Sequence, residues 1–494
     1  TSEMFPTRMS ARSSRDDFGI KWYDWDFGDG ESLRTRNPWV DHVYTTAGTY
    51  LLTLIVTDYA GHTAVDASSV NVSTDPVVVC VPWQFQGGIE EPHDTIDGKQ
   101  VILKGVCWSK NATLTYTWDF GDGSPTQSGA VSDSYKIEAY HTYTGVEGKP
   151  FIASLTVTDG DGLIASDRYL VRIRADSIDV EINMAIDDGL WWLHGRMTRA
   201  AFVPGTYGDG TIGYGYWTQA NGYGATNYKL SPTSSALQAF HVNGHRETGD
   251  LRSNPYVETT ARGLRYLTHA MRPIATAPQT YGDPDLNHNG LGIENNLNSD
   301  QRAPYEVGQA MDALVASGEE GTYALTGPTG LIHRTYRNLV TEMVDVYSWG
   351  QSDSATVGGG WRYAWHSNPD NSAAQWGAIG MLAAEEVWGI AAPQWVKDRN
   401  NVWLNYSHNG TGFGYSGAGN GNCTTPSGMV QLCFVGANAH DDPGTSEDDR
   451  DARWAAAEDY IASQWNATWW FRNSSENNRF AYYAYYAFTK AMRT

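Results

Sequence analysis

The apolar and polar residues follow two different patterns along the chain. Up to residue 174, short runs rich in β-branched residues alternate with turn residues, which predicts strands. The clearest run is 50–57, where apolar and small polar residues alternate; similar runs occur at 77–81, 101–106 and 169–173. Beyond residue 174, Ala, Leu, Gln, Trp and Met recur with helical spacing. We therefore expect β domains followed by a helical domain.

The β part contains an internal repeat. The hexapeptide Trp-Asp-Phe-Gly-Asp-Gly occurs at 25–30 and again at 118–123. Each copy is followed by a His-x-Tyr triplet and then by a strand-like run that ends in Thr-Asp. A repeat of roughly 90 residues with strand signals throughout is typical of a repeated β domain.

Both copies resemble the PKD domain, an immunoglobulin-like sandwich of extracellular proteins. The resemblance implies two all-β sandwiches, at 1–75 and 76–176, with Trp25 and Trp118 filling the core between sheets. It also implies spacer, adhesion or binding modules in an extracellular or cell-surface setting. Residues 5–12 match the second strand of such a sandwich, so we expect an N-terminally incomplete first domain with a targeting segment or anchor upstream. Asp26 and Asp29 are either calcium ligands or caps of the turn.

The remaining residues, 177–494, form recurring pairs of helix-like segments. In most pairs a first helix leads into a glycine-aromatic turn, and a second helix follows. The helices are expected at 190–201 and 231–243, 255–271 and 303–317, 334–349 and 371–388, 393–404 and 427–437, and 451–464 and 478–492. Helical hairpins repeated at this spacing predict a solenoid or a closed ring.

One stretch gives this repeat a family likeness. Gly-Gly-Trp-Arg-Tyr at 359–363, followed by Asp-Asn-Ser-Ala-Ala-Gln-Trp at 370–376, resembles the repeat of squalene-hopene cyclases and protein prenyltransferases. The resemblance implies an all-α α/α toroid of helical hairpins over 177–494, with Gln and Trp side chains between outer and inner helices. The same toroid carries cyclases, prenyltransferases, thioester proteins and non-catalytic scaffolds, so it does not specify a function.

The motifs of the catalytic toroids are missing. The sequence contains no Asp-x-Asp-Asp acid, no zinc ligand set and no Cys-Gly-Glu-Gln run. Glycoside hydrolysis or polysaccharide lysis remains an alternative, because a carboxylate pair or a Tyr-His pair suffices for it. Its candidate residues are Glu258, Glu306, Asp312, Glu342 and Asp345, with His241 or His333. The alternative interpretation is that these are solvated helix faces or caps, and we assign no catalytic residue.

A calcium site is predicted in the long connection before residue 303. Oxygen-bearing side chains occupy every second position from 283 to 289, and a Gly and a Glu follow. Calcium takes six to eight oxygen ligands from tightly turning loops of this kind. The stretch resembles the calcium loops of dockerins and thrombospondin type 3 repeats, although its Gly and its late acid do not both match their register. The predicted ligands are Asp283, Asp285, Asn287, Asn289 and Glu294. The alternative is an Asn/Asp-rich turn between two helices.

Composition narrows the setting. A formal net charge of -22 argues against a nucleic-acid partner, because few cations are available to displace phosphate counterions. No run of 18 apolar residues occurs, so no transmembrane segment is expected. The cysteines fall into two sequence pairs, Cys80 with Cys107 and Cys423 with Cys433, which predict two disulfides or else buried thiols.

We favour a non-catalytic extracellular or cell-surface scaffold or adhesion protein, as part of a surface layer or filament. Its expected partners are other surface proteins, copies of itself or extracellular glycans. A secreted carbohydrate-active enzyme with PKD spacer modules is the alternative, since it explains the 20 Trp and 29 Tyr. A terpenoid-cyclase-like enzyme is disfavoured by the missing acid motif.

Overall fold

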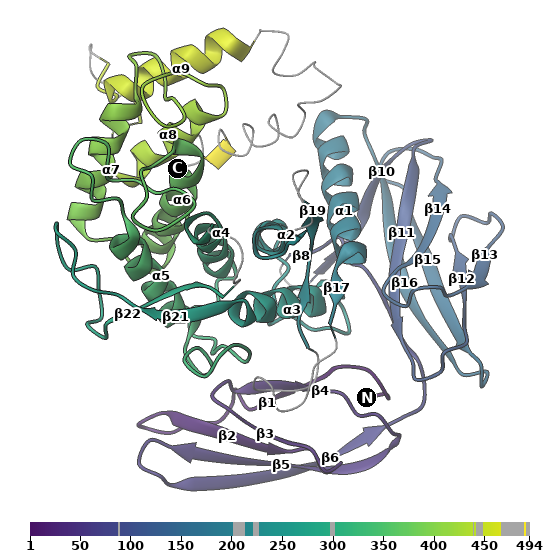
Figure 1. Cartoon of the computed structure of the whole chain (residues 1–494). Coiled ribbons are helices and arrows are strands. Elements are labelled where there is room, and N and C mark those ends of the chain that lie inside the picture. Colours follow the sequence, from purple (N-terminus) through teal and green to yellow (C-terminus); the bar gives the residue numbers. More distant parts are fainter. Residues whose placement is uncertain are drawn as a thin grey trace. The chain divides into compact units, whose positions relative to one another are not determined.

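The computed structural model describes residues 1–86, 89–200, 213–220, 227–296, 302–437, 439–440, 448–465 and 489–490. The chain divides into two compact units, Thr1–Thr268 and His269–Thr494. The first unit contains both β-sandwiches and three helices, and the second contains six helices among its described residues (Figure 1).

The first sandwich has a four-stranded sheet of order β3-β2-β5-β6 facing a two-stranded sheet, β1-β4. Its strands are β1 (Thr7–Ser10), β2 (Ile20–Asp26), β3 (Ser32–Thr35), β4 (Trp39–His42), β5 (Gly48–Asp58) and β6 (Thr63–Val72). Alternation along β2 turns Tyr23 and Trp25 inward, where they pack with Phe27, Val40 and Tyr44. The apolar residues that β5 and β6 turn toward this core are only partly buried.

The second sandwich has the same plan with two more strands. A five-stranded sheet, β10-β16-β15-β12-β13, faces a three-stranded sheet, β14-β11-β7, and β10 runs parallel to β16. Its strands are β7 (Val77–Cys80), β10 (His93–Ile96), β11 (Gln100–Trp108), β12 (Leu114–Asp119), β13 (Gln127–Ala130), β14 (Ile137–Thr142), β15 (Pro150–Asp159) and β16 (Ile164–Arg174). A small hairpin of β8 (Gln84–Gln86) and β9 (Ile89–Glu91) lies between β7 and β10 along the chain.

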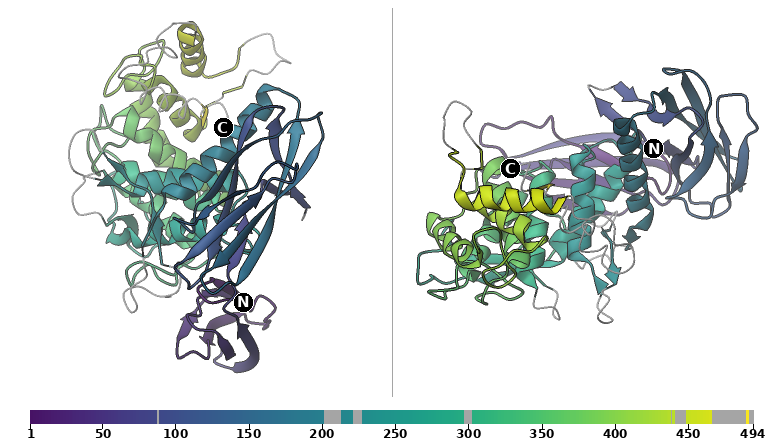
Figure 2. Two further views of the ribbon diagram at one scale, coloured as in Figure 1. Left: turned by 90° about the vertical axis from the view of Figure 1, so that its right-hand side faces the viewer. Right: turned by 90° about the horizontal axis from the view of Figure 1, so that it is seen from above.

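The outer face of the β14-β11-β7 sheet is also buried. Val79 and Val106 pack there against Leu190, Trp191 and Phe240, which belong to the helices that come next in the chain. These helices are α1 (Ile178–Arg196), α2 (Leu230–Val242) and α3 (Tyr256–His269). The short strands among them are β17 (Thr198–Arg199), β18 (Gly215–Tyr216), β19 (Gln219–Ala220) and β20 (Asn227–Tyr228). Figures 1 and 2 show α1 running alongside the second sandwich, so this sandwich has a core on each side of one sheet.

A charged cluster joins α1 to the same sheet. Asp187 of α1 pairs with Lys104 of β11, which is buried, and accepts from His93 of β10 at 3.0 Å. Burial raises the pKa of Asp187, but Lys104 and His93 outweigh it and hold the pKa below its usual range. Removing one partner would leave a buried charge uncompensated, so the cluster ties α1 to the second sandwich.

The second unit is helical. A hairpin of β21 (Met271–Ala275) and β22 (Leu291–Asn295) comes first. The helices are α4 (Ala303–Ala316), α5 (Tyr336–Gly350), α6 (Asn371–Trp388), α7 (Gln394–Ser407), α8 (Thr424–Phe434) and α9 (Ala452–Trp465). Helix α6 packs against both α4 and α8. Helices α4 and α6 approach each other so closely that a Cβ on Gly308 of α4 would overlap the backbone carbonyl of Trp376 of α6.

Amide and indole side chains connect successive hairpins, as the toroid resemblance implies. The Trp403 indole of α7 donates to the Asn371 side-chain oxygen of α6 at 2.8 Å, and Gln431 of α8 donates to the same oxygen at 2.9 Å. Trp361 of the Gly-Gly-Trp turn is fully buried and donates to the Tyr347 carbonyl at 2.9 Å. These bonds support stacked helical hairpins, while closure into a ring stays a prediction.

The helical part is confirmed as helical, with nine helices among the described residues. Helix α1 begins well before the predicted 190–201, and the β21–β22 hairpin was not predicted. The last predicted helix, 478–492, lies outside the described residues except for 489–490. None of the helices that the structure describes combines the length and apolarity needed to cross a membrane.

Candidate metal centre

The predicted calcium loop is the connection between β21 and β22. Its side chains fold back on their own backbone: Asp283 accepts from the Asp285 amide at 3.0 Å, and Asp285 accepts from the Asn287 amide at 3.2 Å. Short Asp and Asn side chains favour such turns because they mimic a backbone acceptor. His288 has φ of 59° and Gly290 has φ of 73°, so the chain reverses tightly here.

This loop packs against two acidic residues of α5. Glu342 and Asp345 are three positions apart, so they lie on one face of the helix, and neither is exposed to solvent. The Glu342 Oε1 atom accepts from the side-chain amides of Asn287 at 3.1 Å and Asn289 at 2.6 Å. The Asp345 Oδ1 atom accepts from the Leu286 backbone amide at 2.9 Å. Both carboxylates therefore face the loop.

The charges at this contact are unbalanced. Arg334 pairs with Glu342 and is the basic side chain that the structure describes in contact with it. Glu342 Oε2 and Asp345 Oδ2 are buried and have no hydrogen-bond partner among the residues that the structure describes. Burial raises the pKa of Asp345 to about 8; the Leu286 amide opposes this shift, and the charges of Glu342, Asp285 and Asp283 add to it. Without a further cation, Asp345 is thus mostly protonated at neutral pH.

Glu294, the predicted late acid, lies in a different environment. It is on β22 opposite Arg272, and its carboxylate accepts from Arg272 at 2.7 Å and from the Trp365 indole at 2.8 Å. Asp283 is more than half exposed, 3.7 Å from His288. The structure thus brings Asn287 and Asn289 together with Glu342 of α5, and the Leu286 backbone together with Asp345, while it engages Glu294 elsewhere.

The arrangement offers oxygen donors of the kind that hard cations bind. Carboxylate and side-chain amide oxygens suit Ca²⁺ and Mg²⁺, whereas zinc and copper sites use imidazole or thiolate. In the described part of the chain, no three His, Cys, Asp or Glu side chains are already grouped as a metal site. The amides of Asn287 and Asn289 present nitrogen, not oxygen, to Glu342. The candidate donors lie close together, but the two amides would have to present oxygen in place of nitrogen before they could coordinate an ion.

The other candidate catalytic residues do not converge. Glu258 lies on α3 of the first unit, where Arg199 and Arg262 pair with it. Burial raises the pKa of Glu258, but these two guanidinium groups outweigh it and lower the pKa. On α4, Glu306 accepts from Asn295, and Asp312 pairs with Lys490 at 2.8 Å.

The two candidate histidines belong to different units. His241 is a buried residue of α2 in the first unit, and His333 precedes α5 in the second with φ of 66°.

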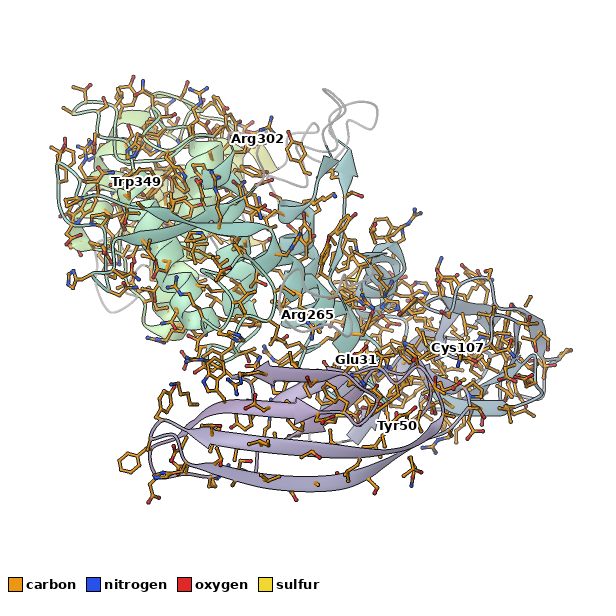
Figure 3. All side chains as sticks on the ribbon, turned by 60° about the horizontal axis from the view of Figure 1, so that its bottom comes forward. Glu31, Tyr50, Cys107, Arg265, Arg302 and Trp349 are labelled. Carbon is orange, nitrogen blue, oxygen red and sulfur yellow. The ribbon has the colours of Figure 1, made fainter. Side chains whose placement is uncertain are left out.

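The predicted disulfides are not formed, because the structure holds Cys80, Cys107, Cys423 and Cys433 as thiols. Cys80 lies opposite Gly105, and Cys107 opposite Val78, so the first two cysteines are diagonal neighbours on the β7–β11 ladder. Diagonal side chains are about 7–8 Å apart, too far for a disulfide without backbone movement. Cys423 precedes α8 and Cys433 lies near its end, which separates them by roughly 15 Å along the axis. Figure 3 shows Cys107 among the strands of the second sandwich.

The Asp residues of the two hexapeptides cap their turns, as one of the two interpretations expected. Asp26 accepts from the Gly28 amide at 3.0 Å, and Asp119 accepts from the Gly121 amide at 2.9 Å. Asp29 accepts from the Glu31 amide at 3.1 Å. These residues stabilise turns in both sandwiches.

Comparison with known proteins identifies part of the β region. Residues 3–73 match the PKD domain. Solved structures with related folds include the fibronectin(III)-like modules of Clostridium thermocellum CbhA, at 14% identity and a TM-score of 0.15, covering 35% of this chain and 87% of that one. Carbohydrate-binding modules of the β-sandwich superfamily match at 17% identity and a TM-score of 0.14, covering 29% and 80%.

The FN1–FN3 domains of chicken CNTN1 match at 9% identity and a TM-score of 0.16, covering 33% of this chain and 59% of that one. Likeness at these scores carries no conclusion about function. The PKD match confirms the first of the two predicted copies, while the second copy and the toroid stay predictions.

Proposed function

We propose that the chain is a non-catalytic scaffold or adhesion protein of the extracellular space or cell surface. The PKD match over residues 3–73 supports the setting, because domains of this kind are typical of extracellular proteins. Its partners in this proposal are other surface proteins, further copies of the chain or extracellular glycans.

The observation that carries the proposal is the condition of the candidate catalytic carboxylates. Each accepts a hydrogen bond or an ion pair from within its own unit: Glu258 from two arginines, Asp312 from Lys490, and Glu342 from Arg334 and two amides. A catalytic pair would instead flank a space for the glycosidic bond, with about 5–10 Å between carboxyl groups. The engaged acids are better explained as structural.

The packing of the second sandwich also supports a structural role. Its β14-β11-β7 sheet shares an apolar core with α1, α2 and α3, and Lys104 and Asp187 reinforce the contact. A flexible spacer would have few contacts with the neighbouring domain. An apolar core that continues from the sheet into the helices favours a rigid structural role for this part of the chain.

The first sandwich offers an exposed apolar surface for partners. Leu51 of β5 and Val65 of β6 are largely solvent-exposed, and Ile55 of β5, which is 37% exposed, lies directly opposite Val65 in the ladder. Single exposed apolar residues are ordinary, but a cross-strand group of them favours contact with another surface.

A secreted carbohydrate-active enzyme is the second candidate, and one observation favours it. Asp345, whose pKa burial raises to about 8, lies on the same helix face as Glu342, and a carboxyl group that stays protonated beside a second one suits general acid catalysis. Against it, both residues are buried beneath the loop containing Asn287 and Asn289. A glycosidic oxygen cannot reach them in this conformation.

The two functions are separated by assaying the full chain against a panel of soluble polysaccharides. We expect no release of reducing ends or unsaturated products, and self-association or polysaccharide retention in ultracentrifugation and affinity electrophoresis. The double substitution Ile55→Asp and Val65→Asp should weaken that association, with Thr63→Asp on the same strand as control. If the wild-type chain degrades a polysaccharide and Glu342→Gln abolishes that activity, the enzyme hypothesis replaces the scaffold hypothesis. Protease shaving of intact cells tests the location.

A further inference from the structure

We propose that Asp285, Asn287 and Asn289 of the β21–β22 connection bind a calcium ion together with Glu342 and Asp345 of α5. The inference is independent of the scaffold role, because it concerns only the residues that hold the ion. It also replaces the ligand set that the linear motif predicts: two acids more than 50 residues further along the chain take the place of Glu294.

The first argument is the placement of the donors. The loop turns the Asn287 and Asn289 side chains onto Glu342, and the Leu286 backbone onto Asp345. Asp285, one position before Leu286, is the third carboxylate of the proposed site, and in this structure its two oxygens accept from the Asn287 and Gly290 backbone amides. Two segments of different secondary structure therefore present oxygen-bearing side chains to one another, as a calcium site assembled from a loop and a helix requires.

The second argument is the pair of unsatisfied oxygens. Glu342 Oε2 and Asp345 Oδ2 belong to residues with no solvent exposure, and neither oxygen accepts a hydrogen bond from a described residue. Burying a carboxylate oxygen without a partner is costly, so folded proteins normally supply one. A cation would satisfy both oxygens at once.

The donor chemistry favours calcium over other metals. Among the described residues, the side chains that hydrogen-bond Glu342 here are the carboxamides of Asn287 and Asn289, together with the guanidinium of Arg334. Calcium tolerates irregular sets of six to eight oxygens, whereas Mg²⁺ demands near-octahedral geometry. Binding requires the Asn287 and Asn289 amides to rotate so that oxygen replaces nitrogen. At Asn289 this rotation gives up the hydrogen bond that its side-chain oxygen accepts from the Leu291 backbone amide at 2.8 Å. The ion would then fasten the β21–β22 connection to α5.

Calcium titration of the chelator-treated full chain by isothermal calorimetry tests this assignment. We expect a Kd on the order of 10⁻⁴ to 10⁻³ M, in the range of extracellular calcium modules. Asp345→Asn keeps the shape and the acceptor for Leu286, yet removes one charged ligand; it should weaken binding about tenfold or more, which is 1.4 kcal/mol. Glu294→Gln is the matched control, because it makes the same chemical change in the same hairpin and should leave Kd unchanged.

Two outcomes overturn the proposal: a wild-type chain that does not bind calcium at millimolar concentration, or a Glu294→Gln variant that loses binding while Asp345→Asn retains it. If Asp345→Asn unfolds by circular dichroism, Asn287→Asp decides instead. It adds a carboxylate to the proposed site, so it should tighten calcium binding several-fold, and weaker or unchanged binding contradicts the site. These results do not depend on whether the chain proves to be a scaffold or an enzyme.

Discussion

The two β-sandwiches carry the same motif but are completed differently. In both, a histidine ring stacks on the hexapeptide phenylalanine, His42 on Phe27 at 3.8 Å and His141 on Phe120 at 4.0 Å. In both, a tyrosine hydroxyl donates to the carbonyl of that phenylalanine, at 3.1 and 3.0 Å. The repeated residues thus build one local structure twice, around the turn that the hexapeptide forms.

The difference lies at the sheet edges. The second sandwich has strand β7 beside β11 and strand β10 beside β16. In the described part of the first sandwich, a parallel bridge of Ser2 with Ser73 lies at the end of β6, and no strand lies beside β1. The β15 residues Leu155 and Val157 that share a core with Trp118 are buried, whereas the apolar residues of β5 that pack near Trp25 are only partly buried. A shared motif determines the turn, and the flanking strands determine how well the core is closed.

The largest expected effect comes from removing the central tryptophan of each copy. Trp118→Ala should cost about 4–5 kcal/mol of unfolding free energy, because a large fully buried side chain leaves a cavity that the closed core cannot fill. Trp25→Ala should cost about 3 kcal/mol, since its half-buried neighbours can relax into the space. Urea unfolding of the full chain measures both values. Equal losses of unfolding free energy in the two variants would contradict the inference that the second sandwich core is more completely enclosed than the first.

The junction beside the second sandwich should also respond to acid. His194 donates to the Tyr135 carbonyl at 3.0 Å, and His245 accepts from Asn254 at 3.0 Å. Burial lowers the pKa of both, to about 3 for His194, with Arg199 contributing, and to about 4 for His245, against the opposing charge of Asp187. Both imidazoles are therefore neutral in the folded chain at any pH near neutrality.

The sign of the pH effect is set by these shifts. Below the unfolded pKa of about 6.5, the unfolded chain binds protons that the folded chain rejects, so stability is full above pH 6.5 and falls toward pH 4. We expect a loss of about 2–3 kcal/mol per histidine by pH 4.5. Urea unfolding at pH 7.5 and 4.5 measures it, and His245→Gln should lessen the difference. If the free energy of unfolding is the same at both pH values, His194 and His245 are accessible to water in the folded chain, which contradicts the prediction.

Substitution of one hexapeptide glycine tests whether the two turns are equivalent. Gly28 has φ of 79° and Gly121 has φ of 70°, and an added Cβ would overlap the backbone of Leu51 or Ile152 respectively. Ala at either position should cost about 2–3 kcal/mol from strain and overlap. The matched controls Gly30→Ala and Gly123→Ala have positive φ but open space, so each should cost about 1–2 kcal/mol. Thermal unfolding ranks the stability of the four variants. If Gly30→Ala and Gly123→Ala destabilise the chain as much as Gly28→Ala and Gly121→Ala do, overlap of the added Cβ with the backbone does not contribute.

The sequence predicted well whatever depends on local pattern. The hexapeptides, the strand alternation and the bounds of α6 are properties of neighbouring residues, and they were found. The β21–β22 hairpin was missed because Pro273 interrupts a short apolar run that otherwise suits a strand. The start of α1 was missed because residues 178–184 alternate apolar and polar, a period that suits a strand and not a helix. Part of what holds this helix is the long-range pairing of Asp187 with Lys104.

The candidate metal centre could be predicted only in part, for the same reason. Its loop ligands form a local motif, but the contribution of α5 depends on a contact between segments far apart in sequence. One signal was available: Glu342 and Asp345 interrupt an apolar helix face that includes Leu339, Met343 and Val346, where charged residues are uncommon. A buried face carrying two acids predicts a cation partner more strongly than a solvated face does.

The smallest expected effect concerns the extra strand of the second sandwich. Because Cys107 lies opposite Val78 and not opposite Cys80, the wild-type chain should show four thiols when denatured without reductant. In the folded chain Cys107 should react slowly, since burial, with a smaller contribution from Asp133, raises the pKa of its thiol to about 12. The substitution Val78→Cys places a cysteine directly across the ladder, so mild oxidation should then form a bond to Cys107. Mass spectrometry after alkylation counts the thiols. A Cys80–Cys107 bond in the wild type would mean that β7 pairs in a register shifted by two residues, and its outward valines would then contact different residues of α1.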